Sequence, residues 1–148
     1  MRDLYEQALA LWHDGQCAQS EALARRLAQV APAFAPGFAL LATFHLQHGQ
    51  AGHARPLLEH ALCLQPDLVE AWINLGNACL ELDDTDAAVQ AFENARRQGA
   101  EGVAYLLGHG LACLGKGGFA PARRLLVQAY ALEPEAADVR ELLAHAPQ

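Results

Sequence analysis

The sequence predicts an all-α fold, a solenoid of four antiparallel helix pairs followed by a short C-terminal cap helix. The first observation is a spacing of 34 residues, or twice that, between chemically similar positions. Three sets show it: Pro32, Pro66 and Pro134; Gly15, Gly49 and Gly117; and Ala54, Ala88 and Ala122. A fixed period of this size indicates stacked supersecondary units. The second observation is that 53% of residues are hydrophobic but only 7% aromatic, so small helix-forming side chains dominate.

The period divides the chain into four units, 1–34, 35–68, 69–102 and 103–136, with the cap helix at 137–146. We interpret 1–148 as one domain. In the second unit a helix is expected from Pro36 to Gln47, because apolar residues recur there at helical spacing. Gly49 permits a tight turn, and a second helix then runs until Pro66, which cannot continue the backbone ladder.

Small residues are predicted where the two helices of each pair meet, so that the backbones approach closely. The first helices contribute Ala8, Ala42, Gly76 and Gly110, and the second helices contribute Ser20, Ala54, Ala88 and Ala122. Larger side chains such as Leu58, Phe92 and Leu126 should fill the adjacent space. Pro56 and Pro121 are expected near the starts of their helices, and Asp138 is expected to cap the last helix.

The third unit carries a recognisable motif. It reads Trp72-x-x-Leu75-Gly76-x-x-Cys79, then Ala88-x-x-x-Phe92 and Ala95. This resembles the tetratricopeptide repeat (TPR) family, whose pattern differs only in a Tyr, here Cys79, and a closing Pro, here Ala100. The resemblance implies stacked helix pairs that bind a protein or peptide partner in a concave groove lined by the first helices.

Charge and cysteine usage limit the function classes. The formal net charge is −7, the pI is about 5.4 and there is one lysine, which argues against nucleic-acid binding. The sequence contains no run of 18 apolar residues, so no membrane span is predicted. The N-terminus lacks a secretory signal pattern. The four cysteines are Cys17, Cys63, Cys79 and Cys113. We interpret them as small buried thiols, which favours a reducing, cytoplasmic location.

No enzyme, cofactor or metal site is predicted. Gly110-x-x-x-x-Gly115-Lys116 matches most of a phosphate-binding loop, but Gly117 stands where Ser or Thr is needed and no strand precedes it. His45 replaces an aromatic residue of the repeat pattern, so its ring is expected in the core, away from His48. The other histidines are expected to be solvated or packed rather than to bind zinc.

The resemblance assigns partner-binding positions by their register in the first helix of each unit. They are Tyr5, Leu9 and Trp12; Thr43, Leu46 and Gln47; Glu70, Ile73, Asn74, Asn77, Leu80 and Glu81; and Leu107 and Leu111. The set is mostly apolar with acidic edges. It would suit an amphipathic helix or extended segment with apolar anchors and some Lys or Arg.

Three alternatives remain open at the level of sequence. Exposed Tyr5, Leu9 and Trp12 on the first helix favour a self-associating assembly, including a homodimer. The chain could also be a docking module of a larger enzyme, or a bacterial secretion-type chaperone. Part of the groove could be covered by the chain itself or by a second copy.

Overall fold

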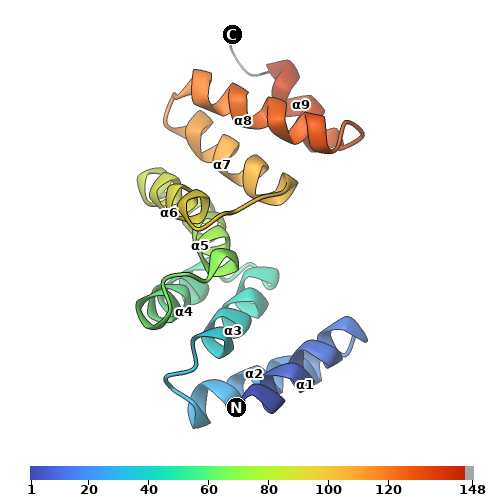
Figure 1. Cartoon of the computed structure of the whole chain (residues 1–148), viewed down its shortest axis with the longest axis vertical. Coiled ribbons are helices and arrows are strands. Elements are labelled where there is room, and N and C mark those ends of the chain that lie inside the picture. Colours follow the sequence, from blue (N-terminus) through green and yellow to red (C-terminus); the bar gives the residue numbers. More distant parts are fainter. Residues whose placement is uncertain (146–148) are drawn as a thin grey trace. The chain divides into compact units, whose positions relative to one another are not determined.

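The computed structural model describes residues 1–145, and these form nine α-helices and no strand (Figure 1). The helices are α1 Arg2–His13, α2 Cys17–Val30, α3 Ala35–Gln47, α4 Ala51–Leu64, α5 Val69–Glu81, α6 Thr85–Arg97, α7 Val103–Gly115, α8 Phe119–Leu132 and α9 Ala137–His145. The predicted all-α class, with four helix pairs and a C-terminal helix, is confirmed. The last predicted cap residue, at 146, lies outside the described residues.

The turn inside each helix pair has one geometry in all four repeats. Gly15, Gly49 and Gly117 have φ of 80°, 71° and 78°. In the same position the third repeat has Asp83, with φ of 59°, which is the one positive-φ residue other than glycine in the described chain. Each turn is closed by a backbone hydrogen bond to the carbonyl five residues earlier, for example from the N–H of Gln50 to the oxygen of His45 at 2.8 Å.

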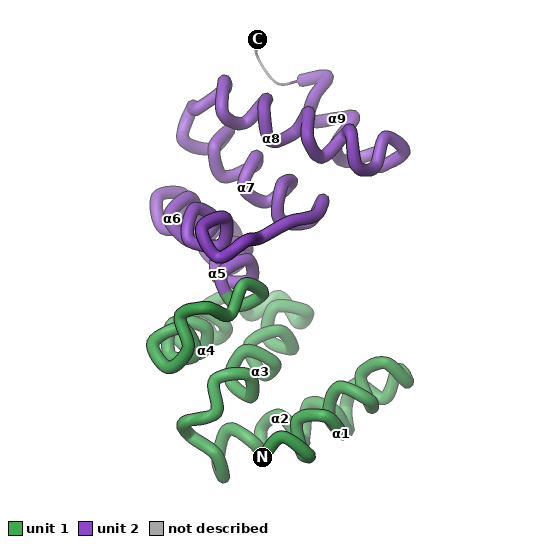
Figure 2. Tube along the Cα trace, viewed as in Figure 1, with its two compact units in different colours: residues 1–71 green, residues 72–148 purple. Residues whose placement is uncertain are grey.

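The chain forms two compact units, residues 1–71 and residues from 72 onward, and the boundary falls inside α5 (Figure 2). In the first unit α1 packs on α2, α2 on α3 and α3 on α4. In the second unit α6 packs on α7, α7 on α8 and α8 on α9. Within each unit these helices therefore contact their neighbours in sequence, as expected of repeats that bury their faces against one another.

Small residues occupy the predicted contacts between paired helices in the first unit. Ala8, Ser20, Ala42 and Ala54 are all fully buried, and Leu58 beside them is also fully buried. The hydroxyl of Ser20 donates a 2.6 Å hydrogen bond to the carbonyl of Ala8, across the α1–α2 contact. The side chain that replaces the usual alanine is thereby satisfied within the core.

In the second unit the core is built around Phe92, which is fully buried on α6. A Cβ added to Gly76 on α5, or to Gly108 on α7, would come within 2.6 Å of the Phe92 ring. Gly110 similarly lies against Leu126, at 3.2 Å from a virtual Cβ. At these contacts a large apolar side chain therefore packs directly against the backbone of a glycine.

Three local expectations are corrected. Pro56 lies inside α4 rather than at its start, so the backbone hydrogen bond it would have donated is lost. Asp138 lies in the first turn of α9 rather than capping it. Cys17 and Cys63 are exposed, while Cys79 and Cys113 are buried as predicted. Pro121, the third residue of α8, does lie where its missing N–H is not needed.

Candidate functional site

The first-helix residues of the first unit are less exposed than the sequence suggested. Tyr5, Leu9 and Trp12 are half-buried and pack against a cluster that includes Ala8, Leu41 and Phe44. The ring centroids of Trp12 and Phe44 are 4.7 Å apart, and those of Tyr5 and Phe34 are 5.6 Å apart. These aromatic side chains thus stabilise the α1–α3 part of the unit. The expectation that they are freely exposed is wrong.

The remaining candidates of this unit have mixed accessibility. Thr43 and Leu46 on α3 are half-buried, whereas Gln47 and Glu70 are exposed. The hydroxyl of Thr43 donates to the carbonyl of Ala39 in its own helix at 2.9 Å. Burial, and in second place the Glu70 carboxylate, raises the pKa of Tyr5 above its ordinary value.

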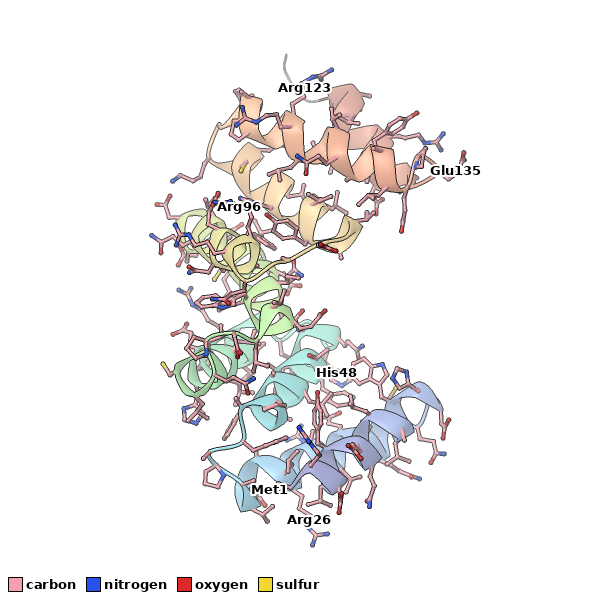
Figure 3. The ribbon with its side chains drawn as sticks, in the orientation of Figure 1. Met1, Arg26, His48, Arg96, Arg123 and Glu135 are labelled. Atoms are coloured by element: carbon pink, nitrogen blue, oxygen red, sulfur yellow. The ribbon has the colours of Figure 1, made fainter. Side chains whose placement is uncertain are left out.

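The histidine expectation is also corrected. His45 is half-buried, and its Nδ1 lies 2.7 Å from the side-chain oxygen of Gln50. Its ring lies 5.5 Å from that of His53. His48, labelled in Figure 3, lies 3.4 Å from Glu21. The ring stays near the surface because the α3–α4 turn places Gln50 within hydrogen-bonding reach. Among the described residues no group of three or more His, Cys, Asp or Glu side chains is arranged to hold a metal.

On α5 the candidate residues divide between core and surface. Ile73 is buried, with 8% of its area exposed, so it offers little to a partner. Asn74, Asn77 and Leu80 are half-buried, and Glu81 is exposed. The amide oxygen of Asn77 lies 3.1 Å from a virtual Cβ on Gly108, which places Asn77 against α7.

A hollow of about 330 Å³ lies between α7 and α9 in the second unit, and we call it the α7–α9 hollow. Its apolar lining comes from Leu107 and Leu111 of α7 and Leu142 of α9. Leu111 is exposed, at 39% of its area. Asp138 and Glu141 of α9 add two carboxylates beside these leucines, and His145 completes the lining. The hollow therefore combines apolar area with negative charge.

The arginines of the second helices lie on other surfaces, and three of the seven are paired within their own helix. Arg25 bonds Glu21 at 2.6 Å, Arg55 bonds Glu59 at 2.8 Å, and Arg96 bonds Glu93 at 3.0 Å. All three are pairs within one helix, where such contacts contribute only a few tenths of a kcal/mol, about 0.2–0.5. They shape the outer surface more than they stabilise the fold.

One buried polar cluster lies inside the second unit. His109 is 3% exposed, its Nδ1 lies 2.9 Å from the Tyr105 hydroxyl, and its ring stacks on Phe92. Its Nε2 lies 3.2 Å from a Glu93 oxygen, within ion-pair distance, although the orientation does not make a hydrogen bond. Burial lowers the pKa of His109, an effect that the Glu93 carboxylate opposes. The cluster holds α6 against α7.

Sequence reasoning missed the contribution of α9 to the α7–α9 hollow. The cap helix was predicted to cover the last repeat, but its acidic residues were not connected with Leu107 and Leu111. Register within a repeat assigns positions on first helices only, so it cannot assign residues of a helix that follows the repeats.

The His109–Tyr105 contact was detectable in the sequence, because the two residues are four apart and share one helix face.

No described helix combines the length and apolar character that crossing a bilayer requires.

Comparison with known proteins extends the fold assignment. Residues 45–108 match a family model described as tetratricopeptide repeat. A chain of the APC/C hetero-tetramer Cut9-Hcn1 aligns with 98% of this chain at a TM-score of 0.86 and 17% identity. PilF of Pseudomonas aeruginosa aligns with 97% of this chain at a TM-score of 0.85 and 16% identity. MamA from Desulfovibrio magneticus RS-1 aligns with 90% of this chain at a TM-score of 0.73 and 19% identity.

The chain spans 29% of the matched Cut9-Hcn1 chain, 65% of PilF and 76% of MamA. No curated protein sequence matches it significantly. At these identities the structural matches show the fold. The described helix pairs form a helical repeat array, and residues 45–108 of it are similar to tetratricopeptide repeats.

Proposed function

We propose that this protein is a non-enzymatic interaction scaffold, and that the α7–α9 hollow binds an apolar segment of a partner protein that also carries Lys or Arg. The observation that carries the proposal is the composition of the hollow. Three leucines supply apolar area, and Asp138 and Glu141 supply negative charge next to them. Apolar anchors provide most of the affinity of such contacts, and complementary charge provides orientation and selectivity.

The rest of the chain supports a binding role. The net charge of −7 favours cationic partners at longer range. Asn77 of α5 lies against Gly108 of α7, the helix that carries Leu107 and Leu111. One matched neighbour is a subunit of a hetero-tetramer, so the same fold serves protein assembly in that case.

The test uses a displayed library of random peptides, selected on the full chain. Selected sequences should be enriched in Leu or Phe together with Lys or Arg. Leu111→Ser and Asp138→Lys should each weaken their binding by about tenfold, a loss near 1.4 kcal/mol. Leu64→Ser is the matched control, because Leu64 is 40% exposed but lies on α4 of the first unit.

Two results would contradict the proposal. One is the selection of acidic peptides or of none. The other is equal binding by the Leu111→Ser protein and the parent. Trp12→Ala is unsuitable as a test of binding, because its packing on Phe44 would make any effect one of stability.

A further inference from the structure

A second hollow, of about 790 Å³, lies on another part of the second unit, where the α6–α7 loop approaches α8. Gly102 forms part of it at the start of α7, and Leu132 forms part of it at the end of α8. We call it the Gly102 hollow. It shares no residue with the α7–α9 hollow.

The repeat explains why this space is open. Gly102 is the last residue of its repeat, and the equivalent positions in the first two repeats are Phe34 and Leu68. Phe34 is half-buried, and its ring lies 3.6 Å from a virtual Cβ on Gly37 at the first junction. A Cβ built on Gly102 meets nothing within 4 Å. The third junction therefore lacks the large apolar side chain that fills the first.

The rim of the same hollow carries an apolar side chain able to fill such a space. Leu132 lines the hollow yet has 58% of its area exposed. One surface thus presents both an apolar hollow and an apolar projection. This is the self-complementary arrangement that a two-fold contact between identical chains requires.

The charges on the rim are also self-complementary. Arg96 (labelled in Figure 3) and Glu101 both line the hollow. Arg96 pairs with Glu93 of its own helix, but it is 57% exposed and such a surface pair contributes little. Glu101 is exposed and has no ion pair among the described residues. Arg96 of one copy and Glu101 of another carry opposite charges and would attract each other in a two-fold contact.

We propose that the Gly102 hollow is a homodimer interface, in which Leu132 of each copy enters the hollow of its partner and Arg96 pairs with Glu101 across the two-fold axis. The contact is separate from the partner-binding surface proposed above. It also differs from self-association through α1, because Tyr5 and Trp12 pack within their own unit.

Sedimentation velocity over a concentration series tests the proposal. The parent should show a concentration-dependent monomer–dimer equilibrium. Leu132→Glu should weaken it by about tenfold or more, since it places a charge at the centre of an apolar contact. The matched control is Val30→Glu, because Val30 occupies the same repeat position and is also 58% exposed. It should leave the equilibrium unchanged.

A charge exchange distinguishes a second copy from any other occupant. Arg96→Glu and Glu101→Arg should each weaken the dimer, because each places like charges opposite one another. An equimolar mixture of the two variants should dimerise again, since every contact in the mixed dimer joins opposite charges. Circular dichroism should show parental helicity for all variants, whose changed residues are exposed.

The proposal is overturned if the parent stays monomeric throughout the series, or if Leu132→Glu sediments like the parent. It is equally overturned if the mixture of charge variants remains monomeric while each retains its helicity. A monomeric parent whose hollow binds a different protein would assign that occupant in place of the second copy.

Discussion

At the scale of single residues, the second unit depends on the fit between Phe92 and two glycines on neighbouring helices. The ring occupies the space that side chains at Gly76 and Gly108 would need, at 2.6 Å from either virtual Cβ. Because Phe92 is fully buried, the ring cannot swing into solvent to make room. An added methyl group must therefore displace a helix.

We predict that Gly76→Ala destabilises the protein by about 1–3 kcal/mol through overpacking. Gly52→Ala is the control: Gly52 lies in α4 with nothing within 4 Å of its virtual Cβ, so alanine should stabilise by up to about 1 kcal/mol. Urea denaturation followed by circular dichroism measures both. Equal effects of the two changes would refute the packing explanation.

His109 should make the stability of the fold depend on pH. Burial holds the pKa of His109 in the folded protein below its ordinary value of 6.5, so the unfolded chain binds the proton more readily. Its contribution to stability is complete above pH 6.5 and is lost as the pH falls from 6.5 through the lower folded pKa. The free energy of unfolding should therefore decrease on acidification through this window.

His109→Gln should remove that part of the pH dependence, whatever its effect on stability at neutral pH. Chemical denaturation at a series of pH values provides the measurement, with His13→Gln as a control because His13 is exposed. An unchanged slope in the His109→Gln protein would show that other groups cause it. Glu93, Arg96 and Tyr105 are the titratable neighbours that remain in the variant.

At the scale of the element, the turn within each helix pair requires a left-handed residue. The first, second and fourth repeats have glycine there, whereas the third has Asp83 at φ 59°. A side chain in this region is strained, and Asp tolerates it better than most residues. The third turn keeps the same closing hydrogen bond, from the Asp84 N–H to the Cys79 carbonyl at 2.9 Å. The fold thus imposes the turn on a less suitable residue.

Asp83→Gly should therefore stabilise the protein by about 0.5–1 kcal/mol, since relief of strain exceeds the greater chain entropy of glycine. The reciprocal change, Gly49→Asp, should destabilise it by a similar amount. Thermal unfolding of the two variants beside the parent measures the difference. A lower melting temperature for Asp83→Gly would mean that the aspartate makes a stabilising contact that outweighs the strain.

At the scale of the whole molecule, the repeats provide two surfaces on which the sequence departs from its own period. The α7–α9 hollow exists because a non-repeat helix follows the last repeat. The Gly102 hollow exists because glycine replaces a large apolar residue at one junction. The binding and dimerisation experiments above test these surfaces separately, because Leu111→Ser and Leu132→Glu change different hollows.

Sequence alone was enough to predict the four helix pairs, the C-terminal helix and the small residues where paired helices meet. These depend on local and periodic signals: Gly15, Gly49 and Gly117 lie at positive φ in the turns between paired helices, and small residues such as Ala8 and Ala42 recur at a fixed spacing. The departure at Gly102 can be read from the sequence but was not singled out there, and the structure shows that it leaves an open space.

The exposure of individual side chains, and the contacts between helices that the 34-residue period does not relate, became known from the folded structure alone. Trp12 packs on Phe44, His45 stays near the surface beside Gln50, and α9 places its carboxylates beside Leu107 and Leu111. Exposure depends on which neighbours fill the surrounding space. That depends on side chains from several helices at once, whereas a repeat pattern specifies only the helix on which each residue lies.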